Sequence, residues 1–200
     1  MKLSHVEGAI LAGTQAGARG LDEAGVGGQG TSPLERVATW LDGALERVRI
    51  VLPREASNPT TLARIDPASR TRDALAGVEA ALCACEVSAV LVAAPEVPEL
   101  DSRLLFALLG LVPTEGGADI VVPLTPRGPE PRLAVYRPRI LPEVRRRIAA
   151  RDFSLHGLLD AVQTQPVPWD LLRPLDPELR SLREEPRSRS RPLEDEDPGG

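Results

Sequence analysis

Short apolar runs alternate along this chain with segments of helical spacing, and this alternation constrains the fold more than any other feature. The first apolar run is Val6–Gly13, which ends in glycine, and the next is Val48–Leu52. Between them Ser32 can cap a helix, and Glu35 stands three residues later, where it completes a capping box. Apolar residues then recur at helical spacing, which gives that helix one face to lay on a sheet. The pattern predicts a strand, a helix and a second strand in succession.

The same alternation continues to about residue 180. Further strands are expected at Val87–Ala94, Asp119–Leu124 and Leu133–Tyr136, and further helices from Asp73, over Asp101–Leu111, over Pro138–Ala150 and over Ser154–Val162. Strands that alternate with helices need crossover connections, and these favour parallel pairing. The predicted class is therefore α/β: a single Rossmann-like three-layer domain over residues 1–180 with a mainly parallel twisted sheet. Residues 181–200 are rich in Pro, Ser and charge and are predicted to be a disordered charged tail.

Composition excludes several classes of function. The net charge is −5 and only 2% of the residues are aromatic, which argues against nucleic acid as a partner. The longest apolar run, Leu104–Val112, is far shorter than the roughly 18 residues that cross a bilayer, so no membrane segment is expected. No secretory signal pattern is visible at the N-terminus, and we expect a cytoplasmic protein.

Two clusters of reactive or charged residues have simple structural interpretations. Cys83 and Cys85 are two apart, a spacing that fits neither a CxxC motif nor a zinc knuckle, and we expect them to be small apolar fillers. The run Arg145–Arg147 is most simply the solvated face of a helix, with an anion-binding patch as the alternative.

Ligands of open α/β sheets bind beyond the carboxyl ends of the strands, so the residues after each strand are the candidates for chemistry. The Gly-rich segment from Gly13 to Gly30 could cradle phosphate with its backbone N–H groups, or could simply be a flexible loop. Glu96, between two prolines, could hold Mg²⁺, or could be a solvated turn residue. Asp73 could face a ligand, or could serve only as a helix cap.

Several short motifs occur in the order found in one known family. The chain has ILAGTQAGARGLDE at residues 10–23, GTSPLERV at 30–37, DALAGVEAAL at 73–82, PEVP at 95–98, EPRLAVY at 130–136 and LDPEL at 175–179. Over about residues 5–180 this order resembles the molybdenum cofactor guanylyltransferases, of the nucleotide-diphospho-sugar transferase-like superfamily. That family has L-A-G-G-x-S-x-R-M-G-x-D-K first, C-D-M-P after a Val-rich strand, and Q-P-L-x-A-V-Y later.

The resemblance implies a nucleotide-diphospho-sugar transferase-like fold and a reaction. Family members bind GTP and Mg²⁺ and transfer GMP to the phosphate of molybdopterin, with release of pyrophosphate. Carried over to this chain, the resemblance places Leu11, Ala12, Gly13 and Asp73 at the nucleotide, Glu96 at the metal, and Arg19 and Glu96 in catalysis. It also makes a molybdoenzyme-maturation partner an expectation.

One departure from the family pattern bears directly on the chemistry. The family lysine of G-x-D-K falls on Glu23, and Lys2, which precedes the first strand, is the chain's one lysine. A unit charge pair at about 4 Å and an effective dielectric of about 20 is worth roughly 4 kcal/mol, so replacing attraction by repulsion weakens triphosphate binding substantially. Arg19 is the candidate replacement cation. The alternative to an enzyme is a catalytically inactive relative that acts as a binding or scaffold module.

Overall fold

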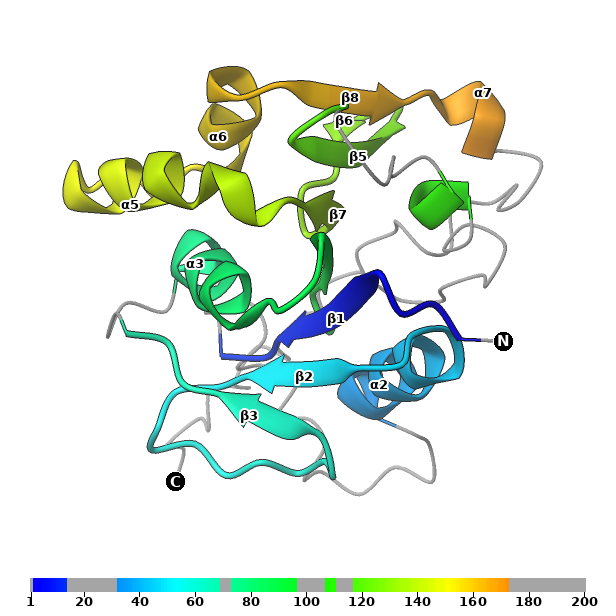
Figure 1. Ribbon diagram of the computed structural model, residues 1–200, viewed down its shortest axis with the longest axis vertical. Helices are drawn as coiled ribbons and strands as arrows, with labels where there is room; N and C mark the ends of the chain where they lie inside the picture. Colours follow the sequence, from blue (N-terminus) through cyan, green and yellow to red (C-terminus); the bar gives the residue numbers. More distant parts are fainter. Residues whose placement is uncertain (1, 14–31, 69–72, 97–106, 111–116, 173–200) are drawn as a thin grey trace, which may run out of the picture.

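The computed structural model describes residues 2–13, 32–68, 73–96, 107–110 and 117–172. Its centre is an eight-stranded sheet in the order β3-β2-β1-β4-β7-β5-β6, with β8 paired to β5 (Figure 1). The strands are β1 Val6–Leu11, β2 Val48–Val51, β3 Ala63–Ile65, β4 Ala89–Ala93, β5 Ile120–Thr125, β6 Gly128–Pro129, β7 Leu133–Tyr136 and β8 Thr164–Val167. The helices are α2 Pro33–Ala44, α3 Ala74–Ala84, η1 Pro138–Ile140, α5 Leu141–Ala149, α6 Leu155–Ala161 and α7 Trp169–Leu172, with a further helical turn at 107–110.

Two apolar cores, one on each face of the sheet, make the molecule three-layered. Side chains of β1 alternate between them: Ile10 belongs to the core beneath α2, and Leu11 to the core beneath α3, α5 and α6. Figure 1 shows α2 on one side of the sheet and α3, α5 and α6 on the other. The predicted α/β class and three-layer architecture are confirmed.

Pairing in the sheet is parallel in one half and mixed in the other. β1 pairs in parallel with β2 and β4, and β2 with β3. β7 is antiparallel to both β4 and β5, and β5 is parallel to β8. Because β7 runs opposite to both of its neighbours, β5 runs the same way as β4. The carboxyl ends of β1, β2, β4 and β5 therefore meet at one edge of the sheet, which we call the carboxyl edge.

Local sequence signals place the first helix. Ser32 caps α2: its hydroxyl accepts from the Glu35 amide at 3.2 Å, and the Glu35 carboxylate accepts from the Ser32 amide at 2.9 Å. Pro33 opens the helix, and the predicted capping box is confirmed. The Ser32 contact lowers the pKa of Glu35, because the amide donor favours the charged carboxylate.

The sequence pattern missed three strands and located other elements only in part. β3, β6 and β8 have four residues or fewer, and β8 contains a proline, so they carry little periodic signal. Of the helix predicted over Asp101–Leu111, only residues 107–110 lie within the described part of the chain, and they are helical. The tail 181–200 lies outside the described residues. Within the part that is described, no helix is long and apolar enough to cross a bilayer.

Candidate functional site

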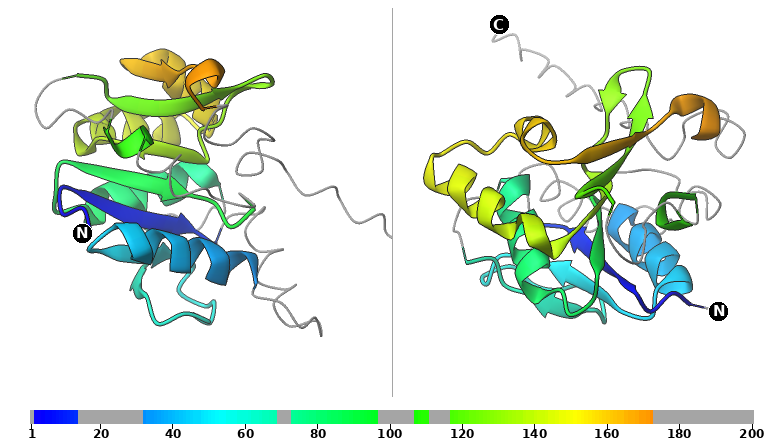
Figure 2. Two further views of the ribbon diagram at one scale, coloured as in Figure 1. Left: turned by 90° about the vertical axis from the view of Figure 1, so that its right-hand side faces the viewer. Right: turned by 45° about the horizontal axis from the view of Figure 1, so that its top comes forward.

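The carboxyl edge brings together the ends of three neighbouring parallel strands. The register pairs Ile10 with Ala93 across β1 and β4, and Leu11 with Val51 across β1 and β2. Gly13 lies three residues after Ile10, and Glu96 lies three residues after Ala93. The two residues therefore follow their strands at equivalent positions along the sheet. In the left view of Figure 2, β1 and β4 run towards the same side, where their carboxyl ends lie together.

Gly13 is held tightly against the end of β2. Its amide donates to the Val51 carbonyl at 3.1 Å. A Cβ at this position would overlap the ring of Pro53 at a separation that real Cβ atoms do not show. Only glycine lets the two backbones approach this closely. The predicted phosphate-binding segment therefore starts from a backbone position that β2 fixes.

Leu11 and Ala12 can contribute only backbone atoms to a ligand. Their side chains are 1% and 0% exposed and belong to the two cores. The remainder of the Gly-rich segment, including Arg19, Asp22 and Glu23, lies outside the described residues.

Glu96 is the carboxylate at the end of β4. The residue is half-buried, and both of its carboxylate oxygens are shielded from solvent. In the described part of the chain, no group of three or more His, Cys, Asp or Glu side chains could form a protein-built metal site. Mg²⁺ commonly takes only one or two carboxylates and completes its shell with water and substrate phosphates, so a single Glu96 fits such an ion.

Asp73 stands at the N-cap of α3, as predicted, but its side chain makes no capping hydrogen bond. The helix is anchored to β1 instead: Gly77, in the next turn, lies so close that a Cβ there would be 3.0 Å from the Leu11 side chain. Asp73 is half-buried, and its carboxylate is not used to stabilise the helix end.

One charged pair at this edge was not predicted. Before β7, Arg132 Nε and Nη2 each donate to Glu130 at 2.9 Å, in a two-pronged ion pair. The Arg132 carbonyl accepts from the Ala94 amide at 3.0 Å, which places this turn beside the end of β4. The sequence contains a signal for this pair, because the acidic Glu130 and the basic Arg132 stand at the positions of Q and L in the Q-P-L-x-A-V-Y motif. The resemblance to that motif rests on the matching residues Ala134–Tyr136, which do not include the pair.

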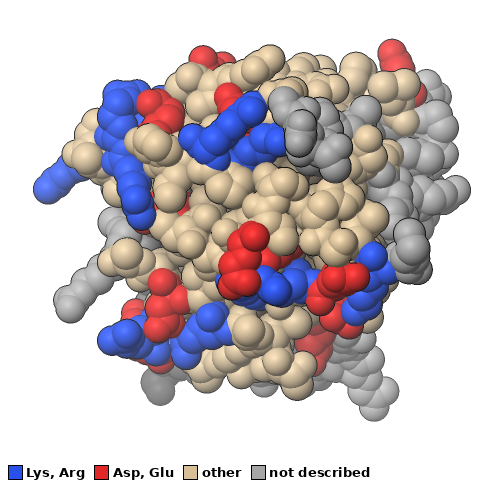
Figure 3. Space-filling view, viewed as in Figure 1, with Lys and Arg blue, Asp and Glu red and all other residues tan. Residues whose placement is uncertain are grey.

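The opposite edge of the sheet carries a second unpredicted charge cluster, whose members are Glu7, Arg47, Arg49 and Glu86. Glu7 is 3% exposed, and its carboxylate accepts from Arg47 at 2.7 Å. Arg47 and Arg49 also donate to Glu86, at 2.6 and 3.0 Å, and hold the pKa of Glu86 below its usual value. Arg49 further caps α3 by donating to the Ala84 carbonyl at 2.6 Å. Acidic and basic side chains are interspersed on the face in Figure 3, as such pairing requires.

The prediction for Arg145–Arg147 was only partly right. Arg145 and Arg146 are exposed and ion-paired with Glu79 and Glu143. Arg147, in contrast, is 9% exposed and pairs with Asp152 at 2.6 Å. The run is thus not uniformly solvated, because α6 packs over one side of α5 and covers this guanidinium.

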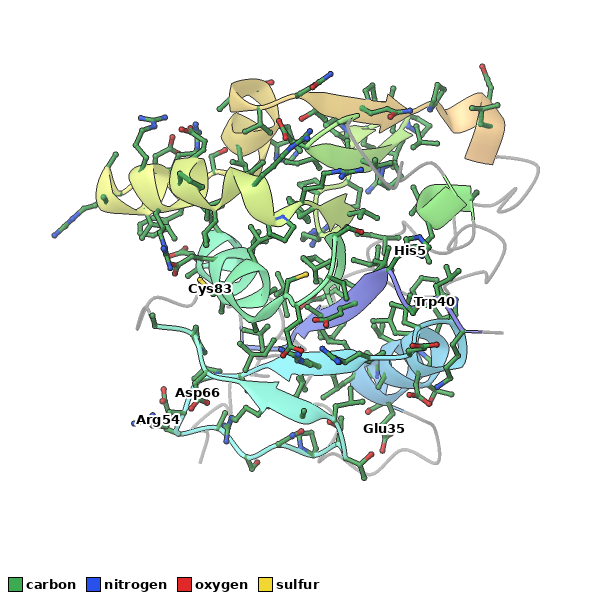
Figure 4. All side chains as sticks on the ribbon, viewed as in Figure 1. His5, Glu35, Trp40, Arg54, Asp66 and Cys83 are labelled. Atoms are coloured by element: carbon green, nitrogen blue, oxygen red, sulfur yellow. The ribbon has the colours of Figure 1, made fainter. Side chains whose placement is uncertain are left out.

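The prediction that both cysteines are small apolar fillers was right for Cys85 and wrong for Cys83. Burial raises the pKa of the half-buried Cys85, as expected of a filler, but Cys83 is exposed, so the filler interpretation is wrong there. Its sulfur contacts Arg145 Nη2 at 3.1 Å. Figure 4 shows Cys83 on α3 well separated from His5, so these residues share no site.

A shallow cavity of about 640 Å³ lies between α5, α6 and the start of β5. Asp119, Arg139, Glu143 and Arg146 line it, and they are paired with one another as Arg139–Asp119 and Arg146–Glu143. It is remote from the carboxyl edge, since Asp119 precedes β5.

Comparison of the sequence with protein-family models gives no match, and no curated protein matches it. The fold, in contrast, matches those of several solved structures. Molybdopterin-guanine dinucleotide biosynthesis protein A from Archaeoglobus fulgidus superimposes with a TM-score of 0.72 at 22% identity, covering 90% of this chain and 91% of that one. The 2-C-methyl-D-erythritol 4-phosphate cytidylyltransferase of Thermus thermophilus gives a TM-score of 0.58 at 19% identity, covering 84% and 89%. A Mycobacterium tuberculosis protein solved as a complex with manganese gives 0.55 at 14%, covering 87% and 98%. The chain therefore has the fold of the nucleotidyltransferases, in the form that molybdopterin-guanine dinucleotide biosynthesis protein A also adopts.

Proposed function

We propose that this protein is a nucleotidyltransferase that transfers GMP from GTP to the phosphate of molybdopterin with the help of Mg²⁺. The observation that supports it best is the convergence of the Gly13 backbone and the shielded Glu96 carboxylate at one edge of a nucleotidyltransferase fold. The family resemblance of the sequence supplies the substrates, and a cytoplasmic location suits a reaction that uses GTP.

The proposed reaction is a substitution at the α-phosphorus. An oxygen of the acceptor phosphate forms a bond to that phosphorus, and the bond to the β-phosphate bridging oxygen breaks, so pyrophosphate leaves with the electron pair. Catalysis of this kind consists mainly of positioning and charge stabilisation.

In this proposal each residue has a defined part. Backbone N–H groups from Gly13 onwards hold phosphate oxygens, Asp73 faces the nucleoside, and Arg19 supplies positive charge. Glu96 would hold Mg²⁺, which when bound neutralises charge that develops on the phosphates.

Thermal unfolding in the presence of GTP and Mg²⁺ tests the proposal. A ligand at 100 times its Kd adds about 2.7 kcal/mol of stability, which is a clear rise in Tm for a domain of this size. An unchanged Tm at millimolar GTP with Mg²⁺ contradicts it. Incubation of the GTP-bound protein with molybdopterin should then yield pyrophosphate.

The second candidate function is that of a binding or scaffold module without catalysis, which acts as a partner in molybdoenzyme maturation. Glu23 at the family's lysine position favours it. The substitution Glu23→Lys separates the two. If the site works and only lacks charge, affinity for GTP with Mg²⁺ rises at least tenfold; a variant that still does not bind GTP supports the module.

A further inference from the structure

The shallow cavity between α5, α6 and the start of β5 combines basic and apolar side chains, and we call it the α5 groove. Its two arginines, Arg139 and Arg146, come from η1 and α5, which follow each other directly in the chain. Apolar surface comes from four further lining residues, which are Ile140, Pro142, Ala161 and Val162. A ligand that fits the α5 groove therefore carries both acidic and apolar groups.

The arginines are the exposed partners of the two ion pairs in the α5 groove. Arg139 donates to the Asp119 carboxylate and to the Gly117 carbonyl. Arg146 donates through Nε and Nη2 to Glu143, at 2.7 Å each. The two arginine side chains are 46% and 64% exposed, whereas the two carboxylate side chains are 18% and 24% exposed. A ligand therefore meets the guanidinium groups before it meets the carboxylates.

Each guanidinium is held in a fixed plane with donors left over. In the described part of the chain, these contacts leave Nη1 of Arg139 and Nη1 of Arg146 without an acceptor. Asp119 is itself anchored, because its carboxylate also accepts from the Gln163 amide at 2.9 Å. A guanidinium has five donors in a planar fork, so a carboxylate on one edge leaves the other edge for a second anion.

The helix beside the groove is basic in an acidic protein. α5 carries three arginines and one glutamate, a net charge of +2, whereas the whole chain has a net charge of −5. Figure 3 shows basic side chains gathered over α5, at the upper left. An acidic ligand is therefore steered to this part of the surface. A nucleic acid fits less well, because the net charge of the chain opposes a long polyanion and the apolar lining gives a phosphate backbone no contact.

The spacing of the two arginines favours a peptide over a small anion. Arg139 and Arg146 are seven residues apart, which is two helical turns, so they share one face about 10 Å apart along the axis. One carboxylate or phosphate cannot reach both. An extended polyproline-like peptide brings every third side chain to the same side, at intervals of about 9 Å. Pro142 lies between the two arginines in the chain and can contact an apolar side chain that separates two acidic ones.

We propose that the α5 groove docks an acidic segment of a partner protein, with one carboxylate on Arg139, a second on Arg146 and an apolar side chain against Pro142 and Val162. This interaction goes beyond nucleotidyl transfer and does not depend on it. Asp119 precedes β5, so the groove lies away from the carboxyl edge, and the partner and a nucleotide can be bound together.

Fluorescence anisotropy with the full-length protein tests the proposal. The probe is a fluorescein-labelled peptide of repeated Glu-Pro-Leu, and the matched peptide has Gln in place of Glu. Arg146→Gln should weaken binding of the Glu peptide about tenfold, because a charge-assisted contact is lost. Arg145 is the control, since it lies on the same helix, is 58% exposed and is paired with Glu79, but does not line the groove. Arg145→Gln should leave the affinity within about twofold.

A second variant keeps every ion pair in place. Ala161 is exposed and lines the groove, so Ala161→Glu adds a negative charge there and should also weaken binding of the Glu peptide. Equal losses in Arg145→Gln and Arg146→Gln, or equal affinity for the Glu and Gln peptides, overturn the proposal. It is also overturned if the Glu peptide does not bind at millimolar concentration, or if single-stranded RNA displaces it and depends on Arg146. If sedimentation shows a dimer that Ala161→Glu abolishes, a second copy of the chain occupies the groove and the partner assignment is wrong.

Discussion

Pro53 occupies the space that a side chain on Gly13 would need, so the ends of β1 and β2 are packed backbone against ring at the carboxyl edge. Substitution Gly13→Ala should destabilise the protein by about 1–3 kcal/mol, the usual cost of overpacking. Gly43 is the matched control because it lies in α2 with open space where a Cβ would stand, and Gly43→Ala should stabilise by roughly 0.5–1 kcal/mol. Urea unfolding measures both; the same sign for the two variants contradicts the packing argument.

Tyr136 is predicted to stabilise the turn before β7. Its hydroxyl is fully buried, and burial raises its pKa, so it remains a donor to the Pro131 carbonyl across the accessible pH range. Tyr136→Phe leaves that carbonyl without its donor and should cost about 1–3 kcal/mol in unfolding free energy. Hydrogen exchange at the Ala94 amide, which donates to Arg132, should accelerate as the turn loosens. An unchanged exchange rate at the Ala94 amide would show that the Tyr136 hydroxyl does not hold the turn in place.

Sequence reasoning succeeded where one local signal decided the outcome and failed where partners were distant in the chain. The capping box at Ser32, the apolar strands and Asp73 at a helix start were all predictable from neighbouring residues. The Glu7 cluster joins segments about forty residues apart, and α6 covers Arg147, so neither followed from local pattern. The Gly13 contact with Pro53 required the register of β1 against β2. The roles assigned to Arg19, Asp73 and Glu96 stay predictions.

The cluster around Glu7 should make stability depend on pH through Glu86. Arg47 and Arg49 lower the pKa of folded Glu86 below its ordinary 4.5. A lowered folded pKa contributes stability that is present above the unfolded pKa and is lost as pH falls through the folded one. Glu86→Gln should therefore lower the Tm at pH 7, and the difference from the wild type should shrink below about pH 4.5. Glu46, an exposed neighbour of Arg47, provides the control; an equal, pH-independent loss in both variants refutes the assignment.

Removal of the Glu7 carboxylate tests the buried part of the same cluster. Its side chain is 5% exposed, and Arg49, at 15%, lies 3.7 Å from it. Glu7→Gln keeps the shape but leaves Glu86 as the one carboxylate of the cluster that both guanidinium groups still share, and about 1–3 kcal/mol of stability should be lost. The loss is smaller than for a wholly uncompensated buried charge because Glu86 still pairs with both arginines. Denaturant unfolding at pH 7 measures this loss of unfolding free energy. A loss below about 0.5 kcal/mol, which is typical of exposed ion pairs, would show that the burial of Glu7 does not strengthen its ion pairs.

Glu96 should strengthen GTP binding when Mg²⁺ is present and should not strengthen it when the metal is removed. If its shielded carboxylate holds Mg²⁺ against the triphosphate, Glu96→Gln weakens binding in Mg²⁺ by at least tenfold, about 1.4 kcal/mol. With metal removed by a chelator, the same carboxylate only repels the phosphates, so the variant should bind GTP no more weakly than the wild type. Glu55 follows β2 at the same edge and is exposed, and Glu55→Gln should leave both affinities unchanged. Calorimetry measures the GTP affinity under the two conditions. If the Glu96→Gln variant keeps the full gain in GTP affinity that Mg²⁺ gives the wild type, the metal is held elsewhere. Asp73 would then be the next carboxylate to substitute.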